Sequence, residues 1–299
     1  MRLDFLIAGF SKCGTTTLCD LLGQHPELFM APRKDAPVLH RLGAHTAQTA
    51  FMERFIGARK GQRWGYGTIW ATDHQFEEAA RDQLLRLCPE VRLIFLARDP
   101  LRRIESSFRE YHHNRMQLSR RFPYTLNAAF DRRPELLSNS CYAERYANYS
   151  DAFSPAQCLV ILLEDLAADQ AGQLRRCFEF LGVDADFVPV KQERLNRGTS
   201  KLQDTPALRE LRRADPVIDA ALLRIPFDIQ TQFLPTLGYR RPFPAVPIAW
   251  SDAAFDRLFP EVTTSATRFL EGLGRPLSVW PRFERLIAGD RRYEFGGEP

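Results

Sequence analysis

Short apolar runs alternate with amphipathic segments over the first two thirds of the chain. Residues 3–8, 91–97 and 159–163 have the length and composition of buried strands. Between and after these runs, apolar positions recur at helical spacing, which predicts helices over 15–24, 75–88, 101–113, 138–152 and 168–181. This alternation predicts an α/β fold with a central parallel sheet flanked by helices.

The pattern changes from about residue 188. A polar, glycine-containing loop over 194–201 is followed by a charged helix near 206–223, a proline-rich stretch and a helical stretch over 252–273. The sequence has no internal repeat and no low-complexity segment. We therefore expect a single domain over 1–299, with an α/β core over about 1–201 and a mainly helical C-terminal extension over about 202–290.

Composition and charge narrow the classes of function. Of the 299 residues, 44% are hydrophobic and 26% are charged, and 41 basic against 37 acidic residues give a net charge of +4. This net charge is too small to predict a nucleic-acid partner. Basic residues do cluster over 98–109 and 115–121, which favours a local cleft for an anionic ligand.

Cysteines and histidines form no metal-binding pattern. The six cysteines show no CxxC pair or zinc spacing and the six histidines make no HExxH motif, so we expect a reduced protein without a metal. No segment reaches 18 consecutive apolar residues, and the first apolar run leads directly into a polar loop. We therefore also expect no membrane anchor, no signal peptide and a cytoplasmic location.

The most informative segment follows the first predicted strand. Residues 9–17 read Gly-Phe-Ser-Lys-Cys-Gly-Thr-Thr-Thr and precede a predicted helix. Backbone N–H groups in such a loop converge on a phosphate, and the positive end of the following helix points at the same anion. A Walker A loop would place lysine directly after the second glycine, whereas here Thr15 follows Gly14 and Lys12 precedes it by two residues. This displacement argues against a hydrolase of nucleoside triphosphates.

A second candidate site follows the predicted strand over 91–97. Arg98 leaves this strand at the edge where α/β sheets bind their ligands, and Ser106 lies eight residues later on the next predicted helix. The arginine would provide a fork of donors and the serine a single donor, a combination that suits a second phosphate. The alternative is that Arg98 forms a structural ion pair with a neighbouring carboxylate.

Together the two motifs resemble those of sulfotransferases that use 3′-phosphoadenosine 5′-phosphosulfate (PAPS). Residues 9–18 resemble the 5′-phosphosulfate loop of this family, and Ile-Phe-Leu-Ala-Arg-Asp-Pro over 94–100, with Ser106, resembles its 3′-phosphate site. Residues 195–201 resemble the later segment that closes over the nucleotide. The similarity extends over about residues 3–201 and is closer to the bacterial and carbohydrate-type members.

The resemblance implies a P-loop-like sulfotransferase fold that transfers a sulfuryl group from PAPS, releases 3′-phosphoadenosine 5′-phosphate (PAP) and needs no metal. Lys12 would stabilise the charge that develops on the bridging oxygen of the leaving phosphate. The nucleotide-binding residues that the resemblance implies are Lys12, Cys13, Gly14, Thr15, Thr16, Thr17, Arg98, Ser106, Arg197, Gly198, Thr199, Ser200 and Lys201.

An acceptor hydroxyl also needs a general base. Carbohydrate-type members place a glutamate after a lysine, shortly beyond the His-Pro that ends the first helix, and Asp35 after Lys34 occupies that place here. An aspartate with an ordinary pKa of about 3.9 is ionised and can accept a proton. His40 is a second candidate, because aryl-type members use a histidine base. The alternatives are an exposed turn aspartate and a packing histidine.

The chain departs from glycosaminoglycan-type members over residues 65–70. Those members carry an acidic residue and a lysine there, whereas this chain reads Gly-Tyr-Gly-Thr-Ile-Trp, which argues against a glycosaminoglycan substrate. Trp64, Tyr66 and Trp70 would give an aromatic surface for a sugar or a planar acceptor, unless they are core residues. We expect a carbohydrate or small-molecule acceptor. A P-loop-type small-molecule kinase and a non-catalytic sulfotransferase-fold binding protein stay open as alternatives.

Overall fold

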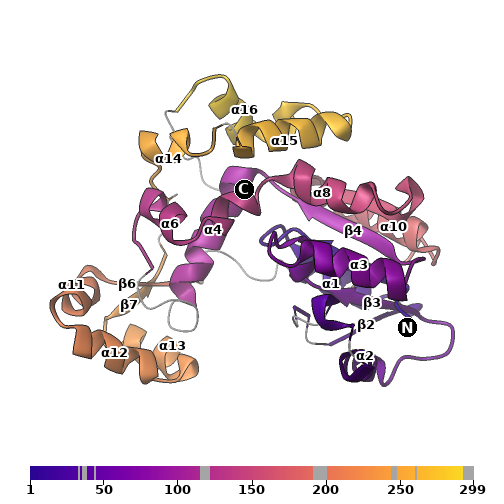
Figure 1. Cartoon of the computed structure of the whole chain (residues 1–299), viewed down its shortest axis with the longest axis horizontal. Helices are drawn as coiled ribbons and strands as arrows, with labels where there is room; N and C mark the ends of the chain where they lie inside the picture. Colours follow the sequence, from indigo (N-terminus) through magenta and orange to yellow (C-terminus); the bar gives the residue numbers. More distant parts are fainter. Residues whose placement is uncertain are drawn as a thin grey trace.

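Five parallel strands form the central sheet that the sequence predicts (Figure 1). The computed structural model describes residues 1–32, 34–35, 39–43, 45–114, 122–190, 201–243, 248–259 and 261–291. The strands β1, β4 and β5 correspond to the three predicted runs, so the α/β class is confirmed. In spatial order the strands are β2 (Leu28–Met30), β3 (Arg63–Gly67), β1 (Phe5–Gly9), β4 (Arg92–Ala97) and β5 (Cys158–Leu162).

The sequence pattern did not predict β2 and β3. β2 has only three residues, and β3 is interrupted by two glycines. The ring of Phe5 on β1 occupies the space beside Gly65, where an added Cβ would lie 2.0 Å from Phe5 Cζ. β3 therefore lies close to β1 because Gly65 leaves room for an aromatic ring, a fit that exists only in the folded protein.

Helices cover both faces of the sheet. The chain runs from β1 out to β2, returns through β3, and then crosses β1 to reach β4 and β5. Because such crossovers are right-handed, the two directions of travel place their helices on opposite faces. On one face the ring of His25, two residues after α1 (Thr15–Gly23), packs against the ring of Phe178 on α10 (Gln170–Leu181), with 4.7 Å between centroids. On the other face Tyr149 of α8 (Tyr142–Ser150) donates a hydrogen bond to the carbonyl oxygen of Glu77 on α3 (Glu77–Leu87).

The helices of the core agree with the predicted segments to within a few residues. α1, α3, α4, α8 and α10 correspond to the five predicted helices. The helical elements up to residue 181 are α1 (Thr15–Gly23), η1 (Leu39–Arg41), α2 (His45–Met52), η2 (Glu53–Phe55), η3 (Trp70–Thr72), α3 (Glu77–Leu87), α4 (Pro100–His113), α6 (Leu126–Arg132), α7 (Glu135–Ser138), α8 (Tyr142–Ser150), η4 (Pro155–Gln157), α9 (Leu163–Ala168) and α10 (Gln170–Leu181).

The C-terminal extension is mainly helical, as predicted, but its helices are shorter. The predicted helix over 206–223 is two helices, because Pro216 begins a new helix and the side chain of Asp215 accepts hydrogen bonds from the amides of Val217 and Ile218. The predicted stretch over 252–273 is likewise divided. The elements are β6 (Leu202–Asp204), α11 (Pro206–Ala214), α12 (Pro216–Arg224), α13 (Phe227–Thr236), β7 (Arg240–Pro242), α14 (Asp252–Asp256), α15 (Glu261–Gly272), η6 (Leu277–Val279) and α16 (Pro281–Ile287).

Helix α4 connects the parts of this extension. α11, α12 and α13 lie near the end of α4 together with the antiparallel pair β6 and β7, whereas α14 and α16 lie near its start (Figure 1). Near that start, Glu105 accepts hydrogen bonds from Trp250 Nε1 at 2.9 Å and from Arg282 at 2.7 Å. All six cysteines are free. Across the described residues, no helix has both the length and the apolar character needed to cross a membrane.

Candidate functional site

The carboxyl edge of the sheet brings together three segments that are far apart in the sequence. The loop over residues 10–14 leaves β1, Arg98 leaves the neighbouring strand β4, and the amide of Asp35 donates a hydrogen bond to the carbonyl oxygen of Gly67 at the end of β3. The crevice between β1 and β4 is the point at which the strand order reverses, where open α/β sheets bind ligands. The structure thus brings the loop over 10–14, Arg98 and Asp35 together at one edge of the sheet.

The loop after β1 has the backbone shape of an anion cradle. Gly14 has a φ of 92° and Lys12 a φ of 67°, and an added Cβ at Gly14 would lie 2.7 Å from Leu163 Cδ1. Leu18 donates the first helical hydrogen bond of α1, to the carbonyl oxygen of Gly14. The preceding amides therefore have no partner within the helix, and the first turn carries neither a side-chain cap nor an acidic residue. In the part of the chain that the structure describes, the amides of Thr15, Thr16 and Thr17 therefore have no hydrogen-bond partner and can hold an anion.

The thiol of Cys13 is buried, and the Cys13 amide donates a hydrogen bond of 3.3 Å to the carbonyl oxygen of Phe10. The side chain is fully buried, with Sγ 3.6 Å from the hydroxyl oxygen of Tyr142. Burial raises the pKa of the Cys13 thiol to about 11, which keeps it protonated and unreactive. Tyr142 also donates a hydrogen bond of 2.8 Å to the carbonyl oxygen of Arg98. One tyrosine thereby supports both the loop after β1 and the end of β4.

Lys12 is held by a carboxylate that the sequence did not single out. Its Nζ lies 2.9 Å from Oε2 of Glu110 on α4, and the same oxygen lies 2.7 Å from Nζ of Lys201. Burial lowers the pKa of Lys12, and the contact with Glu110 opposes this effect. Burial also raises the pKa of Glu110, but the two lysines outweigh it and lower that pKa to about 2. Glu110 is therefore a carboxylate at neutral pH.

A sequence signal for Glu110 existed in the helix spacing. Ser106, Glu110 and His113 lie four and three residues apart, so they share one face of α4. The motif-based prediction stopped at Ser106. Within the described residues the Ser106 hydroxyl makes no hydrogen bond, and its partly exposed side chain lies one turn before Glu110. The spacing places it on the face that contacts the loop lysine.

Arg98 joins the two predicted phosphate sites. Its Nη1 donates a hydrogen bond of 3.3 Å to the carbonyl oxygen of Lys12, and its Nε is buried without a hydrogen-bond partner in the described part of the chain. Buried donors are rarely left unpaired in proteins. An anion beside Arg98 would satisfy this donor, and the predicted 3′-phosphate fits that requirement.

Besides the bond from its amide to Gly67, three further contacts fix Asp35 in position. Its Oδ1 accepts a hydrogen bond of 2.9 Å from the amide of Ile69, and its Oδ2 lies 2.9 Å from Nζ of Lys34. Its carbonyl oxygen accepts a hydrogen bond of 2.7 Å from Trp70 Nε1. The residue has a φ of 64°. These contacts hold the carboxylate against the loop that follows β3.

The rings of Phe76 and Trp70 lie between His40 and the loop that contains Asp35. Its ring stacks on Phe76 with 4.5 Å between centroids, and Phe76 in turn contacts Trp70 at 5.4 Å. Burial lowers the pKa of His40, and its Nδ1 is buried without a hydrogen-bond partner among the described residues. The structure thus connects His40 to the Asp35 loop through two rings.

Of the three residues of the predicted aromatic surface, Tyr66 is a core residue, whereas Trp64 and Trp70 are partly buried. Tyr66 is fully buried and packs edge-on against Phe51 at 5.2 Å, so it cannot contact an acceptor. Trp64 stacks on Phe55 at 5.1 Å at the opposite end of β3. Of the three aromatic residues, Trp70 lies beside Asp35.

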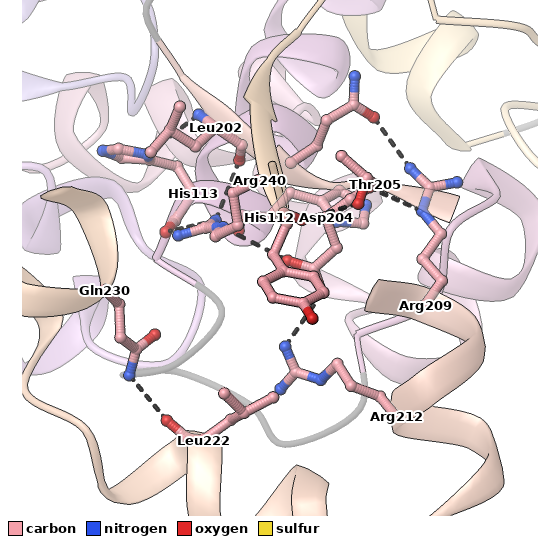
Figure 2. Close-up of polar contacts among 12 residues, drawn as sticks. His112, His113, Leu202, Asp204, Thr205, Arg209, Arg212, Leu222, Gln230 and Arg240 are labelled. Carbon is pink, nitrogen blue, oxygen red and sulfur yellow. Dashed lines mark hydrogen bonds and ion pairs between the residues drawn. The ribbon is translucent and has the colours of Figure 1, made fainter. Parts of the chain in front are cut away.

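Lys201 reaches the site because the strand that follows it is anchored to the end of α4 (Figure 2). The amide of Leu202 donates to Nδ1 of His113 at 3.2 Å. Arg240 Nη2 donates to the carbonyl oxygens of His112, His113 and Leu202 at 2.7, 3.2 and 3.1 Å. The four other predicted residues of this segment, Arg197, Gly198, Thr199 and Ser200, lie outside the described residues.

A buried ionic cluster fixes this anchor. Asp204 lies 3.3 Å from Nε of Arg240 and 3.0 Å from Nη1 of Arg212, and it accepts a hydrogen bond of 3.0 Å from the Tyr124 hydroxyl. The side chains of Asp204 and Arg240 are only 2% and 1% exposed. Figure 2 shows Asp204 and Arg240 side by side, with the side chain of Arg212 directed toward them. The cluster determines where β6, and hence Lys201, lies relative to Glu110.

Comparisons with known proteins agree with this geometry. The sequence matches a model described as the sulfotransferase family over residues 41–187, which include Arg98 and Ser106 but begin after the loop over 10–14. The structure is similar to that of a sulfotransferase from Alicyclobacillus acidocaldarius, with a TM-score of 0.56 and 26% identity over 75% of this chain and 94% of that one.

Two further solved structures are similar at lower scores. The sulfotransferase domain from the curacin biosynthetic pathway has a TM-score of 0.49 and 15% identity over 80% of this chain and 98% of that one. Mouse sulfotransferase SULT7A1 complexed with PAP has a TM-score of 0.43 and 17% identity over 62% of this chain and 60% of that one. No curated protein matches the sequence significantly.

Proposed function

Because this chain belongs to the sulfotransferase family, we propose that it transfers a sulfuryl group from PAPS to an acceptor hydroxyl. The observation that carries this proposal is the contact between the two phosphate sites: Arg98 donates to the carbonyl oxygen of Lys12. The ammonium of Lys12 and the guanidinium of Arg98 thereby lie at one edge of the sheet. This arrangement suits a nucleotide with phosphates at both its 5′ and 3′ positions.

The residues of the loop after β1 would act at the leaving phosphate. The amides of Thr15, Thr16 and Thr17 and the ammonium of Lys12 would hold the 5′-phosphate. When the acceptor oxygen bonds to sulfur and the bond between sulfur and the bridging oxygen breaks, negative charge develops on that oxygen. Donors fixed before the reaction stabilise this charge without reorganisation. Lys12 would thus contribute more in the transition state than in the ground state.

Asp35 is the proposed base that takes the proton of the acceptor hydroxyl. Its Oδ1 contacts a backbone amide and its Oδ2 a lysine, so its carboxylate is held in one orientation beside Trp70. A carboxylate that is held in one orientation beside the acceptor surface meets the geometric requirement of a general base. His40 is the alternative base, behind Phe76. A carbohydrate or a small metabolite is the proposed acceptor, with Trp70 as the surface that it contacts.

Thermal unfolding with added nucleotides tests the cofactor. PAP should raise the melting temperature, because a ligand that binds only the native state stabilises it. ATP with Mg²⁺ should do so much less, since it lacks a 3′-phosphate for Arg98. Equal or greater stabilisation by ATP with Mg²⁺ would favour a small-molecule kinase and overturn the proposal.

Transfer of radiolabelled sulfate tests catalysis itself. PAPS labelled in the sulfuryl group is incubated with the protein and a panel of sugars, phenols and hydroxylated metabolites. A labelled product that Lys12→Ala fails to form supports the proposal. Binding of PAP without transfer to any acceptor, or to water, would instead indicate a non-catalytic nucleotide-binding protein.

A further inference from the structure

Glu110 occupies the position of an anion in the proposed phosphosulfate site. Its Oε2 contacts Nζ of Lys12 at 2.9 Å and Nζ of Lys201 at 2.7 Å, and its Oε1 accepts a hydrogen bond of 2.6 Å from Asn114 Nδ2. The side chains of Lys12, Glu110 and Lys201 are 24%, 25% and 15% exposed, so water screens these charges only in part. One carboxylate thus neutralises one of the two lysine charges.

The proposed nucleotide needs the same lysine. Lys12 can bind a 5′-phosphate or phosphosulfate only if that anion comes within hydrogen-bond distance of its Nζ. The anion would then lie within a few ångströms of Glu110 Oε2, and two negative groups at that distance repel each other. Glu110 has room to move, since its side chain is one quarter exposed and, within the described residues, its only other side-chain hydrogen bond comes from Asn114, one turn further along.

We propose that Glu110 is a displaceable counterion, which holds Lys12 and Lys201 in the nucleotide-free protein and yields Lys12 to the 5′-phosphate when the nucleotide binds. This inference rests on the proposed function. Before the nucleotide binds, the carboxylate would keep close together two ammonium groups that otherwise repel each other. The lysines are therefore already in position when the nucleotide replaces the carboxylate, at the cost of part of the binding affinity.

The backbone next to Lys201 is anchored to α4, so displacement of Glu110 by the nucleotide would need movement of side chains only. Leu202 is bonded to His113, and Arg240 connects Leu202 to the last carbonyl oxygens of α4. Glu110 lies on that same helix. Because both ends of the contact between Glu110 and Lys201 belong to one buried framework, breaking it requires only rotation of two long side chains.

A different role for Glu110 makes the opposite prediction. If Glu110 were a permanent positioning residue, the Lys12 ammonium would need it in order to point at the phosphate. Glu110→Gln would then weaken nucleotide binding. If Glu110 is a displaceable counterion, Glu110→Gln removes a competing anion and strengthens binding. The sign of the change in affinity therefore decides between the two roles.

Isothermal titration of PAP into the wild-type protein and Glu110→Gln measures this sign. We expect Glu110→Gln to bind PAP roughly threefold to tenfold more tightly, the scale of a partly screened ion pair. Glu179→Gln, which removes the same charge from an exposed ion pair with Arg175 on α10, is the matched control and should bind like the wild type. Adenosine 3′-monophosphate, which lacks the 5′-phosphate, should bind equally to all three proteins.

The double variant Lys12→Met/Glu110→Gln completes a double-mutant cycle that tests whether Glu110 acts on PAP binding through Lys12. Without Lys12 there is no shared lysine, so adding Glu110→Gln to Lys12→Met should change PAP affinity by less than about twofold. Glu110→Ala provides a second variant should Glu110→Gln fold poorly, as judged by circular dichroism. Unchanged or weaker PAP binding by both folded variants would overturn the inference while leaving the proposed function intact. Failure of the wild type to bind PAP would instead overturn both.

Discussion

Arg98 donates a hydrogen bond from Nη1 to the carbonyl oxygen of Lys12 at 3.3 Å. The two residues are 86 positions apart in the sequence and leave neighbouring parallel strands, β1 and β4. The bond therefore spans the point at which the strand order of the sheet reverses. It fixes the backbone of the loop lysine relative to the guanidinium proposed to hold the 3′-phosphate.

Removing Lys12 and removing Arg98 should have different effects, the first on kcat and the second on nucleotide affinity. Lys12→Ala should lower kcat by about a hundredfold or more, because its partner charge grows in the transition state. Arg98→Ala should mainly weaken PAP binding, since the charge of the 3′-phosphate does not change during the reaction. Steady-state kinetics with PAPS and titration with PAP separate the two effects. Unchanged PAP affinity in Arg98→Ala would contradict the assignment of the second site.

If Asp35 is the base, its substitution should lower the rate of sulfuryl transfer without lowering nucleotide affinity. Asp35→Asn keeps the size of the side chain but removes the carboxylate that would accept the proton. We expect sulfuryl transfer to fall by about a hundredfold or more, with nearly unchanged PAP affinity. His40→Asn is the matched comparison at the other candidate base. Loss of transfer in His40→Asn, with activity retained in Asp35→Asn, would move the base to His40.

The hydrogen bond between the Leu202 amide and His113 should make the folded protein less stable in mild acid. Its Nδ1 accepts the amide hydrogen of Leu202, so this nitrogen must be unprotonated in the folded protein. Burial lowers the pKa of His113, and Lys201, Arg240 and Lys12 add to this effect while Glu110 opposes it. Because the folded pKa is below the unfolded value of about 6.5, the unfolded state takes up the proton first. The stabilising effect of neutral His113 is therefore complete above pH 6.5 and decreases as the pH falls below it.

Urea unfolding between pH 7.5 and pH 5 measures this effect. His113→Asn should lose less stability than the wild type over this range, because the amide oxygen can accept the same hydrogen bond but does not titrate. His45→Asn, at an exposed position at the start of α2, is the control and should behave like the wild type. Parallel pH profiles for the wild type and His113→Asn would contradict the prediction.

The buried cluster around Asp204 lies outside the α/β core, yet we expect substitution of its Arg240 to lower the free energy of unfolding strongly. Arg240→Met removes the ion pair with Asp204 and the three hydrogen bonds to carbonyl oxygens, and breaking a buried pair costs about 3–5 kcal/mol. We expect this loss in the free energy of unfolding in urea. Arg241→Met, at the exposed neighbouring position on β7, should change it by less than about 0.5 kcal/mol. Equal effects of the two substitutions would show that the cluster does not hold the β6–β7 pair.

The sequence by itself determined the α/β class, the strands β1, β4 and β5, and the position of the loop proposed to bind a phosphate. These features depend on contacts within a few residues. A run of apolar residues is long enough for one strand, and Gly14 permits the positive φ that the loop needs whatever surrounds it. The same is true of the α1 amides, whose lack of partners follows from being at the start of a helix.

Tertiary structure decided which side chains meet across the site. Glu110 is 98 positions from Lys12 and 91 from Lys201, and no local pattern links a helix glutamate to either lysine. Gly65 and Tyr66 gave no strand signal, because their places in β3 depend on neighbours far away in the sequence. Tyr66 packs against the ring of Phe51, and Gly65 leaves room for the ring of Phe5. Charges and rings are local properties of a sequence, whereas their partners depend on strand order and helix packing, which arise only when the whole chain buries its apolar surface.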